Sequence, residues 1–409
     1  MPLPLPFAGV ERRLAWLRGI LLAACFFGML ASVPLWLSTR SFPLVPIAPW
    51  FPILPPPWDK CLFGSLLLAL VLAAWRYRPM VIYFLSASLL AFCEDQNRGQ
   101  PWFYLYWVML LLTLFSAPIA ACRIAMSAAY IWSGVQKINS RFFQVAPAWF
   151  VEPATRWHFP AALVHLLRWS VASAPFLELA IGIAVWIPRL RRPALIAVLL
   201  VHSMVLTFLG PTGHNYNFVV WPWNLAMIGL MCALFGKGEP WEKRLEQNPG
   251  KIARAPDSLL AETLSGLRRS GASMVIVLLF SLLPVLSYFG MWDSYFSFSI
   301  YSENPAVANV FVTQAFVDRL PPRLRPYAQP FQQAYDPERQ GPFLFGFQAW
   351  CYEELHVPPI PEPRNFHFIF DRLRAYSPEP SDLRMIVGTR GGPVIFYQGD
   401  DREFLTPTR

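Results

Sequence analysis

The chain has 409 residues, of which 55% are hydrophobic and 14% charged, whereas about a quarter of residues are charged in ordinary soluble domains. This composition excludes an ordinary soluble enzyme and indicates a membrane protein. The net charge of +9 comes mainly from basic loops between apolar runs, so we expect contact with anionic lipid and no nucleic-acid partner.

The first 290 residues hold a series of apolar runs separated by polar or basic loops. The runs lie near residues 19–37, 62–75, 79–93, 102–121, 124–136, 171–188, 194–210, 218–235 and 272–290. Several are shorter than the roughly 20 residues of a full helical span, so their polar ends should reach headgroups, water or one another. We predict an all-α polytopic membrane bundle of about nine transmembrane helices, whose first helix is not a cleaved signal.

The basic residues beside these runs predict the orientation of the bundle. Lys and Arg stay on the cytoplasmic side of a bacterial-type membrane, so Arg12, Arg13 and Arg18 place the N-terminus inside. Alternation from there also puts the basic residues near 76–78, 123, 189–192 and 237–269 inside. We therefore predict a multi-pass protein of the bacterial inner membrane with a cytoplasmic N-terminus.

The composition changes after Gly290, where the sequence contains no further apolar span. The segment "LRMIVGTRGGPVIFYQG" alternates around a Gly-Gly pair and predicts a hairpin, and "RNFHFIFDRLRAY" has helical spacing. We predict a transmembrane domain over residues 1–290 and a small α+β extramembrane domain over residues 291–409. The orientation places this second domain on the periplasmic or extracellular face.

Ionisable and amide side chains at the ends of the apolar runs are the first candidates for a functional site. The segment "EDQNRGQPWFY" carries Asp95, Arg98 and Gln100 at an outer helix junction, and the alternative is a loop in which Asp95 pairs with Arg98. The stretch "YIWSGVQK" ends in Lys137, and Tyr130 shares its helical face. Gly134 allows a helix or a flat ligand to approach closely. The alternative for Lys137 is a snorkelling anchor with its ammonium among the headgroups.

Two further candidates lie in later apolar runs. Glu178 is an isolated carboxylate that needs a cationic partner, for which Lys137 or Arg98 is available, and the alternative is a purely structural ion pair. His202 lies in the run that ends at "GHNYN", which adds His214, Asn215 and Asn217; a histidine bonded to a neighbouring helix is the alternative. The predicted topology puts Asp95, Arg98, Lys137, His214 and Asn215 on one side of the membrane and suggests a cavity that opens outward.

The histidines do not predict a metal site. His158 and His165 are seven residues apart without a carboxylate motif, and the others are scattered. Haem held by two helix histidines stays an alternative. The chain also has no phosphate-binding loop, dinucleotide fingerprint or nucleophile elbow.

Three segments carry a family resemblance. The stretch "YIWSGVQKIN" resembles the lysine-containing helix of the HTTM proteins, the membrane superfamily that includes vitamin K-dependent gamma-carboxylase. "ELAIGIAVWIPRLRRPAL" and "HNYNFVVWPWNLAMIGLMCALF" resemble the same superfamily and its DoxX-like relatives, and "DQNRGQPWFY" resembles uncharacterised bacterial members. Together these segments cover most of residues 90–240.

The resemblance implies an outer-face enzyme with a reduced quinone as cofactor, either a carboxylase-like lyase or a quinone-linked oxidoreductase. Lys137 matches the lysine regarded as the base in the carboxylase. We therefore predict Lys137 and His214 as catalytic, and Asp95, Arg98, Gln100, Tyr130, Gly134, Glu178, His202, Asn215 and Asn217 as cofactor-binding. The expected partners are the lipid bilayer, a lipophilic quinone, and an exported protein or small-molecule substrate. The other function class is a non-catalytic transporter or assembly protein whose polar residues lock helices together.

Overall fold

The computed structural model describes residues 9–236, 259–331, 342–377, 379–389 and 394–405. The chain forms two compact units that interleave along the sequence. Unit 1 comprises Met1–Ala31, Leu62–Leu89 and Pro101–Glu303, and unit 2 comprises Ser32–Cys61, Leu90–Gln100 and Asn304–Arg409. The sequence predicted one boundary, after residue 290. Unit 2 contains the C-terminal residues and also two earlier segments, Ser32–Cys61 and Leu90–Gln100. Most of the basic cluster at 237–269 lies outside the described residues.

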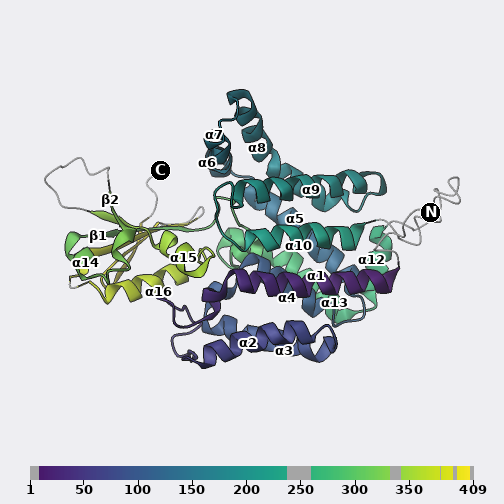
Figure 1. The fold of residues 1–409 in the computed structure, drawn as a ribbon, viewed down its shortest axis with the longest axis horizontal. Coiled ribbons are helices and arrows are strands. Elements are labelled where there is room, and N and C mark those ends of the chain that lie inside the picture. The colour runs from purple at the N-terminus through teal and green to yellow at the C-terminus, as the bar shows by residue number, and fades with distance from the viewer. Residues whose placement is uncertain (1–8, 237–258, 332–341, 378, 390–393, 406–409) are drawn as a thin grey trace. The chain divides into compact units, whose positions relative to one another are not determined.

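Unit 1 is helical. Its helices are α1 (Val10–Ala31), α4 (Pro101–Leu112), α5 (Pro118–Lys137), α6 (Ser140–Phe150), α7 (Glu152–Arg156), α8 (Ala161–Ala184), α9 (Pro188–Leu209), α10 (Val220–Phe235), α12 (Leu259–Arg268) and α13 (Gly271–Leu282), with most of α2 (Trp58–Leu72) and α3 (Tyr77–Glu94). α10 packs between α1 and α9 (Figure 1), and α5 packs against α8.

Four helices among the described residues are long and apolar enough to cross a membrane: Val10–Ala31, Ala161–Ala184, Pro188–Leu209 and Gly271–Phe289. α4 and α10 are apolar but shorter. Many exposed side chains of the four long helices are large and apolar, as expected for helices in contact with lipid. The mostly helical, membrane-like architecture is confirmed, and the number of about nine spans stays a prediction.

α5 and α8 cross where each helix has a glycine. A Cβ at Gly134 would lie 2.5 Å from the Pro175 carbonyl oxygen and 2.7 Å from the Leu179 nitrogen, and a Cβ at Gly182 would lie 2.9 Å from the Ser127 carbonyl oxygen. These are backbone atoms, so they cannot rotate away as a side chain can. The prediction that Gly134 admits the close approach of another helix is confirmed, and this contact brings α8 beside the last turns of α5.

We expect Gly134→Leu to destabilise the protein, because its side chain would collide with the backbone of α8. Overpacking of this kind costs typically about 1–3 kcal/mol. Gly64→Leu on α2 is the matched control, since nothing lies within 4 Å of a Cβ there and the gain in helix propensity is the same. Thermal melting of the solubilised variants measures the difference, and equal melting temperatures would contradict the crossing.

Unit 2 contains a six-stranded antiparallel sheet in the order β2-β3-β1-β4-β5-β6. The strands are β1 (Val307–Val312), β2 (Ala328–Pro330), β3 (Phe343–Phe345), β4 (Leu383–Gly388), β5 (Val394–Gln398) and β6 (Asp401–Leu405), with α14 (Gln314–Arg319), α15 (Phe347–Leu355) and α16 (Pro363–Arg374). The predicted hairpin is β4 and β5, paired from Arg384 opposite Gln398 to Val387 opposite Ile395. The small C-terminal sheet and the predicted helix α16 are thus confirmed.

Candidate functional site

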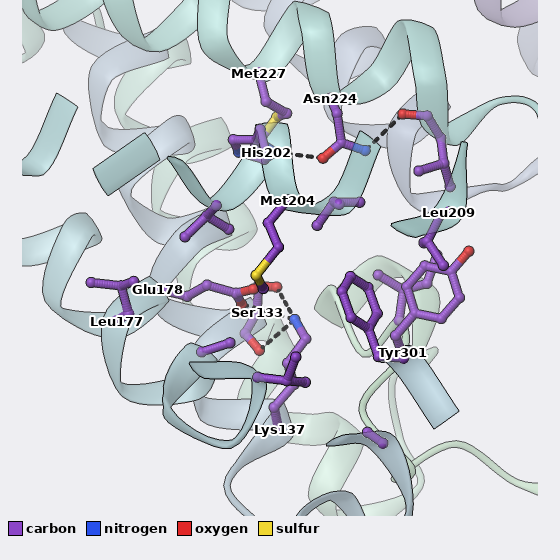
Figure 2. Close-up of a pocket in the computed structure, with 18 of the residues that line it drawn as sticks. Ser133, Lys137, Leu177, Glu178, His202, Met204, Leu209, Asn224, Met227 and Tyr301 are labelled. Carbon is purple, nitrogen blue, oxygen red and sulfur yellow. Dashed lines mark hydrogen bonds and ion pairs between the residues drawn. The ribbon is translucent and has the colours of Figure 1, made fainter. Parts of the chain in front are cut away.

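Unit 1 contains a cavity of about 400 Å³ between α5, α6, α8, α9 and α10. Its wall is mostly apolar, but two groups of hydrogen-bonded polar side chains project into it (Figure 2). One group surrounds Lys137 and the other surrounds His202. In this view Met204 of α9 lies between them. An apolar cavity with a few convergent polar groups is the usual form of a small-molecule site.

The first polar group joins the end of α5 to the middle of α8. Lys137 Nζ donates to Glu178 Oε2 at 2.8 Å, to Ser133 Oγ at 2.6 Å and to the Ser133 carbonyl oxygen at 3.2 Å. The Lys137 and Glu178 side chains are only 9% and 15% exposed. An ammonium has three donors, and each has an acceptor here. Of the two predicted partners for Glu178, the structure therefore selects Lys137, and the ammonium is turned toward this carboxylate.

We expect Glu178→Gln to lower stability by about 3–5 kcal/mol, because it leaves the Lys137 charge buried without its counter-ion. Glu152→Gln is the matched control: Glu152 also pairs with a cation, Arg156, but both side chains are about half exposed, and such pairs contribute roughly 0–1 kcal/mol. Unfolding of both variants in detergent measures the difference. An unchanged melting profile for Glu178→Gln would mean that water solvates Glu178, as in a transport path.

The second polar group links three helices through His202. The Tyr130 hydroxyl of α5 lies 2.6 Å from His202 Nε2, and Asn224 Oδ1 of α10 lies 2.5 Å from His202 Nδ1. Asn224 Nδ2 in turn donates to the Val220 carbonyl oxygen at 2.7 Å. His202 and Asn224 are 9% and 6% exposed. His202 is therefore bonded on both ring nitrogens to neighbouring helices, and it also lines the cavity.

His214, Asn215 and Asn217 lie in the turn after α9 and do not line the cavity. His214 stacks on Trp149 with ring centroids 4.7 Å apart, and its Nε2 donates to the Trp149 carbonyl oxygen at 2.9 Å. Asn217 Nδ2 donates to the Tyr301 hydroxyl at 3.1 Å. Trp149 and Tyr301 are themselves cavity residues. His214 and Asn217 therefore contact two lining residues without lining the cavity themselves, and the catalytic role of His214 stays a prediction.

Asp95, Arg98 and Gln100 belong to unit 2 and take part in its internal packing. Arg98 pairs with Glu94 at 2.5 Å, and Asp95 pairs with Arg40. Gln100 Nε2 donates to the Pro358 carbonyl oxygen at 2.9 Å. The pairing of Asp95 with Arg98, considered from the sequence, is replaced by these two separate pairs. The assignment of the three residues to cofactor binding stays a prediction.

α15 supplies a further carboxylate to this packing in unit 2. The Glu354 carboxylate accepts hydrogen bonds from the Ser41 hydroxyl and from the backbone N–H groups of Ser41 and Phe42. Burial alone would raise the pKa of Glu354, but these bonds favour the charged form and hold the pKa below its ordinary value. The ionised Glu354 carboxylate thus holds the loop at Ser41 and Phe42 against α15.

Three residues of the cavity were not predicted from the sequence: Asn224, which orients His202, and Tyr301 and Met204, which line the cavity. Asn224 has a visible signal, since it is a polar amide within the apolar run "VVWPWNLAMIGL". Met204 and Tyr301 have none, because a methionine or tyrosine beside an apolar run is ordinary packing. Within the described ranges no three His, Cys, Asp or Glu side chains are grouped as metal ligands.

No protein-family model matches the chain, and no curated protein or solved structure matches it at a significant level. The resemblance to HTTM proteins therefore stays a prediction.

Proposed function

We propose that this protein is a membrane enzyme of the HTTM type that binds a reduced, quinone-like cofactor in the cavity of unit 1. The observation that carries the proposal is the position of Lys137, whose ammonium lies in the wall of an apolar cavity of about 400 Å³ beside Glu178. A lipophilic ring fits such a wall, and its hydroxyl group would reach the Lys137 amine in the lining.

Lys137 acts as a base in this proposal only after it has lost a proton. The nearest acceptor is Glu178, 2.8 Å from Nζ. A proton transfer across this contact would leave a neutral amine on Lys137 and a neutral carboxylic acid on Glu178. The free amine would then be placed to accept a proton from a hydroxyl group in the cavity, and the Lys137 ammonium that results would stabilise negative charge there. The overall step moves one proton from the cofactor to the Lys137–Glu178 pair.

The proposal includes the membrane topology that the sequence predicts. The protein would cross a bacterial inner membrane about nine times, with the N-terminus in the cytoplasm and the C-terminal domain outside. Reporter fusions test this arrangement: a fusion after Gly271 should be active only with a cytoplasmic reporter, and one after Arg409 only with a periplasmic reporter. A cytoplasmic Arg409 would make the number of spans even and would remove the outer-face site.

Co-purification tests the cofactor directly. We expect lipid extracts of the purified wild-type protein to contain a quinone, and we expect the folded fraction of Lys137→Ala, which is destabilised by its unpaired Glu178, to lose it. Lys60→Ala is the control, because Lys60 is exposed in unit 2. A quinone retained equally by both variants would contradict the proposal.

The second candidate is a non-catalytic transporter or assembly protein. It is favoured by one observation, that all three Lys137 donors are satisfied within the protein, as in an ion pair that only holds α5 against α8. The two candidates differ in whether the positive charge alone is sufficient at residue 137.

A further inference from the structure

The second polar group of the cavity has a defined arrangement of protons. The Val220 carbonyl oxygen can only accept a hydrogen bond, so the Asn224 side-chain nitrogen must face it at 2.7 Å. The Asn224 oxygen therefore faces His202, and it too can only accept. It follows that His202 Nδ1 carries a hydrogen and donates it to Asn224 across 2.5 Å.

The other ring nitrogen of His202 is then an acceptor. If His202 were an imidazolium, Nε2 would donate to the Tyr130 oxygen, leaving a buried positive charge beside a neutral amide. In the neutral ring Nε2 accepts from the Tyr130 hydroxyl at 2.6 Å, and both residues are satisfied. In the ligand-free protein the Tyr130 hydroxyl therefore donates to His202 Nε2, and His202 Nδ1 donates to Asn224 Oδ1.

The Tyr130 oxygen is the atom of this hydrogen-bonded chain that a ligand hydroxyl can approach from the cavity. When the Tyr130 hydroxyl donates to His202, its oxygen lone pairs remain available to a ligand, and Tyr130 lines the cavity together with His202. Tyr130 and Lys137 are seven residues apart on the same face of α5, which separates their Cα atoms by about 10 Å along the helix. A ligand in the cavity can therefore meet both polar groups through different atoms.

We propose that Tyr130, His202 and Asn224 form a second proton-accepting group of this cavity, which binds the second hydroxyl of a dihydroxy-aromatic ligand. The inference rests on the proposed function. It adds a proton-accepting role for Tyr130 and His202, which the sequence predicted only as cofactor-binding, and a positioning role for Asn224. In the step, the ligand O–H bond breaks and its proton binds the Tyr130 oxygen. The original Tyr130 proton moves to His202 Nε2. The products are a ligand oxyanion, a neutral tyrosine and a His202 imidazolium, so charge and protons balance.

Asn224 is the positioning residue of this relay. Its neutral oxygen fixes the Nδ1–H form of the ring without adding a negative charge. A carboxylate at this position would favour the imidazolium before any ligand arrives. An amide keeps Nε2 ready to accept a proton, and we therefore expect Asn224→Asp to protonate His202 in the ligand-free protein.

Nitrogen NMR of the full chain, labelled with ¹⁵N-histidine in lipid nanodiscs, tests the relay without an activity assay. The six histidines are separated by comparison with His202→Gln, in which the His202 signals are lost. We expect the free protein to show His202 as the neutral Nδ1–H form. Addition of 1,4-naphthohydroquinone under reducing conditions should convert the signals to those of an imidazolium. Tyr130→Phe should bind the probe more weakly and leave His202 neutral even at saturating probe, whereas Tyr83→Phe, at a hydroxyl outside the cavity lining, should behave as wild type.

The outcomes separate this inference from the proposed function. An Nε2–H form in the free protein overturns the relay. The relay is also overturned if probe binding depends on Lys137 but leaves the His202 signals unchanged. That result supports the proposed function. Probe binding that is equal in Lys137→Ala overturns the role of Lys137 in the proposed function, while an imidazolium signal in that variant supports the relay. No binding to wild type overturns both.

Discussion

Lys137→Arg is expected to give a folded, inserted and inactive protein. The arginine can keep the ion pair with Glu178 that Lys137 now makes at 2.8 Å, so the contact between α5 and α8 should survive. An arginine side chain, however, stays protonated in proteins because its pKa lies above about 12. It therefore cannot remove a proton from a ligand hydroxyl, and the loss of a positioned base typically lowers the rate by about 10²–10⁴-fold.

Because the substrate is unidentified, the first readout for this variant is the phenotype of a strain that lacks the gene. Wild type should complement that phenotype and Lys137→Arg should not, at equal abundance in the membrane. Lys60→Arg is the matched control, since Lys60 is an exposed lysine of unit 2. Full complementation by Lys137→Arg would show that a positive charge is sufficient at this position, and the protein would then be the non-catalytic alternative.

Arg98→Met is expected to produce the largest loss of stability in unit 2. The Arg98 side chain is 1% exposed and pairs at 2.5 Å with Glu94, which is 3% exposed. Arg98 also donates to the carbonyl oxygens of Ala91, Leu35 and Trp36 at 2.8, 3.2 and 3.1 Å. Removal of the guanidinium leaves a buried carboxylate without its cation, which costs about 3–5 kcal/mol, and it leaves three carbonyl groups without this donor.

Denaturant unfolding of Arg98→Met measures this loss, with Arg156→Met as the control because Arg156 is 54% exposed in its pair. The double variant Glu94→Leu with Arg98→Met should be less destabilised than Arg98→Met alone, since it contains no uncompensated buried charge. A double variant that loses the sum of the two single effects would show that the two charges are not coupled.

Local patterns were sufficient to predict much of the fold. The apolar runs predicted the long apolar helices of unit 1 but not α6, α7 and α12, and the alternation around the Gly-Gly pair predicted the β4–β5 hairpin. These features depend on neighbours a few residues apart. The division into units was not predictable in this way, because unit 2 combines Ser32–Cys61 and Leu90–Gln100 with the C-terminal residues. The contacts that join them are far apart in sequence, such as Ser41 with Glu354.

The candidate site was predictable where a charge had few possible partners. Glu178 is isolated in an apolar run, so a cationic partner was required, and Lys137 provides it. Arg98 had several acidic neighbours, and the sequence could not show that it selects Glu94 while Asp95 selects Arg40. The Tyr130–His202–Asn224 chain was also beyond the sequence, because it depends on the rotation of α9 and α10 relative to α5.

Ligand binding by cavity-filled variants tests the central claim most directly. Binding of 1,4-naphthohydroquinone to the purified protein under reducing conditions would be measured by calorimetry for wild type, Met204→Trp and Ser203→Trp. Met204 lines the cavity, whereas the adjacent Ser203 is exposed on α9 and does not. We expect wild type and Ser203→Trp to bind equally and Met204→Trp, with an unchanged melting profile, to lose binding. Equal binding by Met204→Trp would place the ligand outside this cavity and contradict the account.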